Sequence, residues 1–163
     1  MKSKVQRKSA RHNTSDKVIR NKRARFDYAL GDSYTVGIVL NGRETKSLRL
    51  GHGQLQGSYV TIKNDELWLI NASIHGTKGI PIEDTEVTRN RKLLAKKREL
   101  GMLMQAKNQG MTIVATDILT TGRFIKVRIA IGKGKREYDK RQTLKRRDDS
   151  KNVARELARS FKK

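Results

Sequence analysis

The chain contains no cysteine, a single proline and few aromatic residues, and its acidic residues are far outnumbered by basic ones. Without cysteine it can form neither a disulfide nor a thiolate metal site, which fits a reducing, intracellular setting. No apolar run approaches the about 20 residues that a membrane helix needs. The charged N-terminus has no apolar segment of the kind found in signal peptides. We therefore expect a cytoplasmic protein with no membrane partner.

Basic residues dominate the chain and concentrate at its two ends. There are 38 Lys and Arg against 16 Asp and Glu, which gives a net charge of +22. Residues 1–25 carry ten basic residues and one acidic residue, and residues 133–163 carry thirteen and five. Such ends can be solvated, disordered tails, and for residues 1–20 this alternative stays open. The two arms together favour nucleic acid, since they lack the bulky apolar face of a membrane-surface helix.

The segment between the arms has the pattern of short strands. YTVGIVL (34–40), SYVTIK (58–63), ELWLINASI (66–74), MTIVATDIL (111–119) and RFIKVRIAI (123–131) are rich in β-branched and aromatic residues. Asn64-Asp65 and Thr120-Thr121-Gly122 each separate two of these runs, and each predicts a hairpin. Within residues 123–131, aliphatic and mostly polar positions alternate, as in a half-buried strand. The prediction is a mainly β fold, a small closed barrel of about six strands rather than a sandwich.

Two or three helices are expected to be embedded among these strands. ETKSLRL (44–50) is short and ends at Gly51. A longer helix is predicted from a Thr88 cap to Gly110, because its leucines recur at three- and four-residue steps. Its basic residues crowd the first turns.

The sequence offers little to a catalytic site. His12, His52 and His75 are scattered, and the acidic residues show no spacing that pairs them with a histidine. GKGK (132–135) lacks the length and the Lys-Ser/Thr ending of a phosphate-binding loop, so it is interpreted as a flexible joint. We expect a protein that is not an enzyme and that needs no cofactor or metal.

The aromatic residues divide into core and tail. Trp68, Tyr59 and Phe124 are assigned to the core. Tyr138, in contrast, lies among charged residues of the tail and is a candidate for stacking on a base.

Five motifs in order resemble one known family: NKRARFDY (21–28), GIVLNGRETKSLR (37–49), SYVTIKND (58–65), TRNRKLLAKKREL (88–100) and GKGKREYDKRQTLKRRD (132–148). Together they resemble the bacterial SsrA-binding protein family, also called small protein B, over roughly residues 18–150. The resemblance implies an oligonucleotide-binding-type barrel. It also implies binding to the tRNA-like domain of transfer-messenger RNA and delivery, with elongation factor Tu, to ribosomes stalled with an empty A site. A monomer is expected.

The resemblance assigns roles to particular residues. Those expected to contact the tRNA-like domain are ten cations and one leucine: Arg23, Arg25, Lys46, Arg49, Arg89, Arg91, Lys92, Leu94, Lys96, Lys126 and Arg128. Those expected at the decoding centre and in the mRNA channel, against small-subunit rRNA, are Lys133, Lys135, Tyr138, Asp139, Lys140, Arg141, Lys145 and Arg146. The chain departs from the family pattern at Thr35-Val36, where an acidic residue and alanine are usual. It departs again at Glu86-Val87, in place of Asp-Pro.

Three parts are therefore predicted: a flexible basic arm (1–20), an RNA-binding barrel (21–132) and a basic tail (133–163). Val153, Leu157 and Phe161 give the tail one narrow apolar stripe. We expect the tail to be disordered when free and helical on the ribosome, since it buries too little to fold by itself. The alternative function is that of a structural ribosomal protein with rRNA-binding arms.

Overall fold

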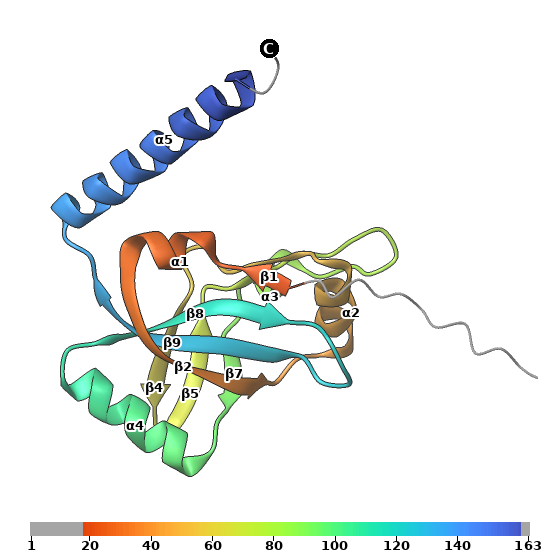
Figure 1. The fold of residues 1–163 in the computed structure, drawn as a ribbon. Coiled ribbons are helices and arrows are strands. Elements are labelled where there is room, and N and C mark those ends of the chain that lie inside the picture. The colour runs from red at the N-terminus through yellow and green to blue at the C-terminus, as the bar shows by residue number, and fades with distance from the viewer. Residues whose placement is uncertain (1–17, 161–163) are drawn as a thin grey trace, which may run out of the picture.

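The computed structural model describes residues 18–160, which form a mostly β structure with helices at its ends and edges (Figure 1). The strands are β1 (Val18–Arg20), β2 (Tyr28–Ile38), β3 (Gly53–Gln54), β4 (Tyr59–Lys63), β5 (Glu66–Ile70), β6 (Ser73–Ile74), β7 (Arg91–Leu94), β8 (Thr112–Leu119) and β9 (Lys126–Gly134). The helices are α1 (Lys22–Asp27), α2 (Gly42–Leu50), α3 (Asp84–Val87), α4 (Lys97–Asn108) and α5 (Glu137–Ser160). Most of the predicted N-terminal arm lies outside the described residues, as does Phe161 of the tail stripe.

Seven strands form one antiparallel sheet in the order β1-β8-β4-β5-β7-β2-β9. A further pairing between β8 and β9 joins the sheet to itself, so that β8, β4, β5, β7, β2 and β9 follow one another in a ring. β3 and β6 pair separately. The ring encloses one apolar core, built from the inward residues of its strands together with Leu48 of α2 and Leu103 of α4. The mainly β prediction, with about six principal strands, is confirmed at this level.

The alternation predicted along residues 123–131 is present in the structure. Ile125, Val127, Ile129 and Ile131 are all at least nine-tenths buried, whereas Lys126 is exposed and Arg128 partly so. Successive residues of a strand point to opposite faces, so β9 supplies the core with one row and the surface with the other. Ala130 is the exception among the outward positions of β9, because it is buried as well.

The turns and the short helix follow from local sequence. Asn64 and Asp65 both have positive φ (50° and 57°) and join β4 to β5 as a tight hairpin. The Asn41 side chain accepts from the amide of Glu44, and the Glu44 carboxylate accepts from the amide of Asn41. This reciprocal cap starts α2, and Gly51, at φ 92°, ends it. The predicted hairpin and the end of the short helix at Gly51 are confirmed, while α2 begins two residues before the predicted Glu44.

The long helix predicted over 88–110 is wrong in its first half. Residues 91–94 form β7, which pairs with β2 and β5, and α4 begins only at Lys97. Arg91 and Leu93 are buried in β7 while Leu94 is exposed, a period of two that the helical interpretation overlooked. As a strand, the segment forms backbone hydrogen bonds with β2 on one side and β5 on the other, and these outweigh its helix propensity. The Glu99 carboxylate, 2.9 Å from the Lys96 amide, caps the start of α4.

Two aromatic residues assigned to the core lie instead at the surface. Tyr59 is 47% and Phe124 68% exposed, and Trp68 is half-buried.

The tail contains helix α5, which begins at Glu137 and extends away from the ring (Figure 1). Among residues 18–160, no helix is both long and apolar enough to cross a membrane.

Candidate RNA-binding surface

Three neighbouring strands present a continuous row of outward residues. Gly37 of β2 is opposite Leu94 of β7 on one side and opposite Lys126 of β9 on the other. Two residues along, Thr35 is opposite Arg128. Residues opposite one another in antiparallel strands point to the same face, so Leu94, Lys126 and Arg128 share one surface. We call this row, with Gly37 and Thr35 between its side chains, the outer row.

Leu94 is 53% exposed, although it is a large aliphatic residue beside polar neighbours. Glycine at 37 makes room for it, since a Cβ there would lie 3.3 Å from the Leu94 Cβ. An exposed apolar side chain between cations suits a ligand that presents sugar or base surface as well as phosphate. Lys96, exposed in the turn after β7, extends the positive charge of this surface.

Arg128 and Arg25 line one hollow of about 400 Å³, together with Tyr28 and Thr116. The Arg128 guanidinium is 3.4 Å from the Asp117 carboxylate, a long and partly exposed pair. Arginine has five N–H donors, so this single contact leaves most of them for a ligand. The structure therefore brings Arg25 of α1 next to the outer row, from about a hundred residues away in the chain.

The β8–β9 loop adds an aromatic surface that the sequence analysis missed. Phe124 is largely exposed, and the guanidinium of Arg123 lies 5.4 Å from its ring centroid. Arg49 of α2 donates to the carbonyl of Arg123 (3.2 Å), which places α2 against the loop that leads into Lys126. The missed signal was its position: Phe124 is in phase with Lys126 and Arg128, the outward positions. Lys46, also on α2, is exposed and lines a different hollow with Arg43 and Pro81.

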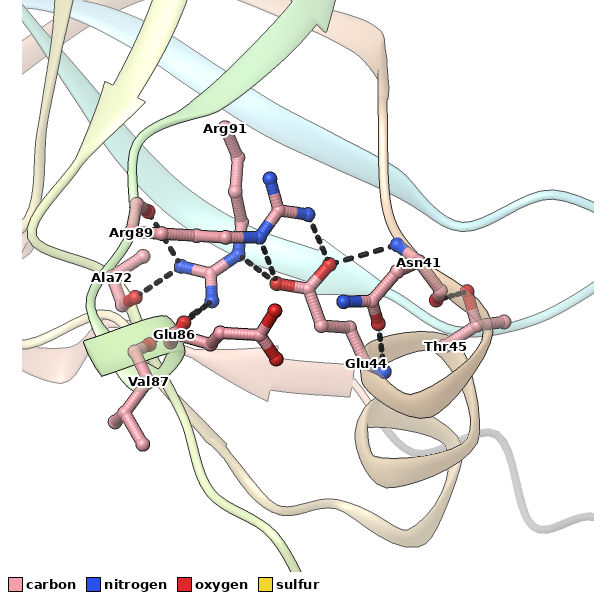
Figure 2. Close-up of polar contacts among 8 residues, drawn as sticks. All are labelled: Asn41, Glu44, Thr45, Ala72, Glu86, Val87, Arg89 and Arg91. Carbon is pink, nitrogen blue, oxygen red and sulfur yellow. Dashed lines mark hydrogen bonds and ion pairs between the residues drawn. The ribbon is translucent and has the colours of Figure 1, made fainter. Parts of the chain in front are cut away.

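Arg89 and Arg91 were predicted to bind RNA, and for Arg91 the structure contradicts this. Arg91 and Glu44 are both fully buried, and the Arg91 Nε donates to Glu44 at 2.8 Å (Figure 2). Its remaining donors go to main-chain carbonyls of residues 72, 86, 87 and 89. Arg89, one-third exposed, donates twice to the same carboxylate. Both arginines neutralise Glu44, and no donor of Arg91 faces solvent.

Glu44 is held ionised by this cluster. Burial by itself would raise the pKa of Glu44, but the hydrogen bonds from Arg89, the Asn41 amide and Arg91 outweigh it and leave that pKa below the ordinary value. The cluster joins α2, the segment before β7 and the β5–β6 connection, so it fixes the position of β7 and therefore of Leu94.

Lys92 is the third cation of this motif, and it forms an ion pair with Glu66 of β5 across the sheet. Both side chains are about two-fifths exposed, and the pair reduces the charge that Lys92 offers to RNA.

The base of the tail is attached to α1. The Lys140 Nζ lies 3.0 Å from the Asp27 carboxylate, and the Lys135 amide donates to the Asp27 carbonyl at 2.9 Å. The hydrogen bond from Lys140 is the main cause that lowers the pKa of Asp27. Tyr138 is 69% exposed and accepts from Gln142, and Arg141 pairs with Glu137 on the helix surface. Lys133 and Lys145 are exposed, and Asp139 and Arg146 lie along α5.

Over the described part of the chain, residues 18–160, no three His, Asp or Glu side chains gather in a way that could hold a metal ion. The fold and this surface define a small, basic, mostly antiparallel protein of a class that binds nucleic acid. A scan against protein families then identifies the protein: residues 18–159 match the family described as SmpB protein, and the chain belongs to that family.

Individual relatives support the same family assignment. The chain is 42% identical over 138 residues to the SsrA-binding protein of Streptococcus pyogenes serotype M49 (strain NZ131), covering 84% of this chain and 89% of that protein. The protein of serotype M18 (strain MGAS8232) is 41% identical over the same length. Among solved structures, a chain from "tmRNA-SmpB: a journey to the center of the bacterial ribosome" matches with a TM-score of 0.63 and 34% identity. That match covers 78% of this chain and 94% of the other.

Proposed function

We propose that this protein is a non-catalytic RNA-binding adaptor of trans-translation, which binds transfer-messenger RNA and acts with it on stalled ribosomes. Membership of the SmpB family supports this, as does the match to a tmRNA-SmpB structure. The observation from the chain itself that carries the proposal is the outer row, where cations and an exposed leucine occupy one face of three paired strands. A structural ribosomal protein is the less favoured function, because the family match separates the two.

In this proposal the outer row receives the tRNA-like domain. Lys96, Lys126 and Arg128 neutralise phosphates as charged donors, while Leu94 packs against the sugar or base surface between them. Arg25 and Arg49 extend the contact at the two ends of the row. Thr35, in the same row, neither repels phosphate nor competes for Arg128, which pairs weakly with Asp117 instead.

The tail is proposed to act in the decoding centre. Tyr138 would stack on an rRNA base, and the cations from Lys133 to Arg146 would follow the empty mRNA path. The helix of the tail carries many positive charges and few apolar residues, so a surrounding RNA channel stabilises it by supplying counter-charge. Residues 133–163 are then a ribosome-contacting arm, which starts in the last two residues of β9 and continues beyond the RNA-binding ring.

Further assignments complete the proposal. The six-stranded ring is taken as a small closed barrel of the oligonucleotide-binding type. Elongation factor Tu is the proposed partner in delivery, the protein acts as a monomer, and it acts in the cytoplasm, where ribosomes are found.

Filter binding tests the proposal directly. The full chain is titrated with transfer-messenger RNA and with a random RNA duplex of equal length at physiological salt. We expect tight, strongly salt-dependent binding with a clear preference for transfer-messenger RNA, because shape adds to phosphate neutralisation. Equal affinity for the two RNAs would refute the proposed function.

A further inference from the structure

A second hollow, of about 490 Å³, lies between α1 and the segment around β3, away from the outer row. It shares no lining residue with the hollow of Arg25 and Arg128. It is lined by residues 19–23 and Phe26 on one side and by residues 53–56 on the other. None of these is acidic. We call it the α1 hollow.

The α1 hollow is held in shape by a buried side chain. The Nδ2 of Asn21 donates to the carbonyls of Leu55 and Ala115, both at 2.9 Å, and its Oδ1 accepts from Ala24. One asparagine therefore caps α1 and ties it to the segment that forms the opposite wall. Gly53 allows the close approach of that segment, since a Cβ there would lie 2.5 Å from Leu48 and 3.0 Å from Ile19.

The rim carries three exposed cations, Arg20, Lys22 and Arg23. Arg23 also pairs with Asp27 at 2.9 Å, so part of its charge is neutralised. Within residues 18–160, no ion pair is formed by Arg20 or Lys22. A rim of this charge attracts an anion, and the phosphate groups of RNA are anions that recur along one chain.

The interior offers flat surfaces and hydrogen-bonding amides. The Arg23 guanidinium lies 5.6 Å from the centroid of the Phe26 ring, which gives a planar cation over a π-face. Gln54 and Gln56 are exposed, and the Gln54 Nε2 donates to the Gln56 Oε1 at 3.2 Å, which leaves the Gln54 Oε1 and the Gln56 Nε2 for a ligand. Aromatic rings and guanidinium planes stack on unpaired bases, and an amide pairs with the edge of an adenine. An acidic peptide would use the cations but neither of these features.

We propose that the α1 hollow is a second RNA site, which takes one unpaired nucleotide, preferentially adenosine. The base stacks on the surface made by Arg23 and Phe26, its edge meets the amide of Gln54 or Gln56, and the flanking phosphates meet Arg20 and Lys22. The volume falls in the range of small-ligand pockets, about 300–1,000 Å³. The proposal rests on the proposed function only in taking RNA as the partner.

The test uses the full chain and a labelled hexamer of adenosine, with a uridine hexamer and hexaglutamate as comparison ligands. We expect the adenosine hexamer to bind more tightly than the uridine hexamer, and hexaglutamate to compete poorly. Phe26→Leu keeps apolar volume but removes the π-face, so affinity for the adenosine hexamer should fall about five- to hundred-fold. The double substitution Gln54→Ala and Gln56→Ala, at exposed positions, should remove the preference for adenosine without affecting folding.

Lys126→Ala, on the outer row, is the matched control: it should weaken binding of transfer-messenger RNA and leave hexamer affinity unchanged. Photo-cross-linking of an 8-azidoadenosine hexamer should label residues within 20–26 or 53–56. The proposal is overturned if cross-links fall only elsewhere, if hexaglutamate displaces the hexamer equally well, or if both α1-hollow variants, Phe26→Leu and the double glutamine substitution, bind the hexamer normally. Loss of hexamer binding in these two variants, with no preference of the wild type for transfer-messenger RNA, would instead refute the proposed function alone.

Discussion

Replacing Glu44 with glutamine is expected to destabilise the protein far more than a single polar substitution normally does. The carboxylate is fully buried and accepts four hydrogen bonds, from the Asn41 amide, from Arg89 twice and from Arg91. Glutamine has nearly the same shape, so little packing is lost. What changes is the charge: Arg91, fully buried, loses its counter-ion.

The size of the effect follows from that burial. Removing one partner of a buried ion pair costs about 3–5 kcal/mol, because the other charge stays desolvated and uncompensated. Domains of this size are stable by about 5–15 kcal/mol in total. The substitution should therefore remove about a fifth or more of the stability. With a urea m-value of about 1–3 kcal/mol/M, the midpoint should shift by about 1 M or more.

The assay is urea unfolding followed by circular dichroism, with Glu66→Gln as the matched control. Glu66 pairs with Lys92 at two-fifths exposure, and exposed pairs contribute about 0–1 kcal/mol. If Glu44→Gln shifted the midpoint no more than Glu66→Gln, the structural role of the cluster would be wrong. Replacing both fully buried partners with apolar residues, Glu44→Leu with Arg91→Met, should recover part of the loss, since no fully buried charge is then left unpaired and Arg89, one-third exposed, can be solvated.

The pH dependence of the same cluster has a defined direction. The pKa of Glu44 is lower in the folded state, so its contribution to stability is present above the ordinary glutamate value of about 4.3 and is lost as pH falls through the folded value. Between pH 5 and 8 the cluster should therefore contribute constant stability, and the urea midpoint difference between wild type and Glu44→Gln should shrink only in more acid solution.

Three further predictions concern RNA and the tail. Lys126→Ala should weaken transfer-messenger RNA binding and reduce the slope of log K against log salt by about 1, measured by filter binding, and an unchanged slope would remove Lys126 from the phosphate contacts. Asp27→Asn should free Lys140 at every pH, whereas in the wild type their contact should break only as pH falls below the ordinary aspartate value, because the pKa of Asp27 is lowered when folded; NMR of the lysine side chain follows the contact. Deleting 133–163 should leave RNA binding by the ring intact and abolish tagging of stalled chains, and Tyr138→Ala should slow tagging; normal tagging by either variant would contradict the decoding-centre role of the part removed.

Features that depend on a few adjacent residues were predicted well. The Asn64-Asp65 hairpin, the α2 helix and the alternation along β9 each rest on local backbone preference or on a period of two. The segment 88–96 was not predicted, because its cations and leucines fit a helical spacing as well as a strand. Pairing with β2 and β5 decided between the two, and neither strand is adjacent in sequence.

The residues of the candidate site likewise fall into those that the sequence indicated and those that only the structure revealed. The resemblance selected Leu94, Lys126 and Arg128, but it could not say that Gly37 brings the first two into register. It also grouped Arg91 with the RNA contacts, because an arginine that binds RNA and one that neutralises a buried carboxylate look the same in a sequence. Phe124 was assigned to the core by its residue type, while its phase along the strand placed it outside.

By itself, the sequence determined that the partner is a polyanion, which family the motifs indicate and where the principal strands lie. Net charge and short-range pattern need no knowledge of neighbours in space. Only the tertiary structure decided which arginines lie exposed at the surface and which neutralise a buried glutamate. That outcome depends on desolvation, and burial is a property of the packed chain: Glu44 of α2 meets Arg91 of β7 only because the sheet brings them together.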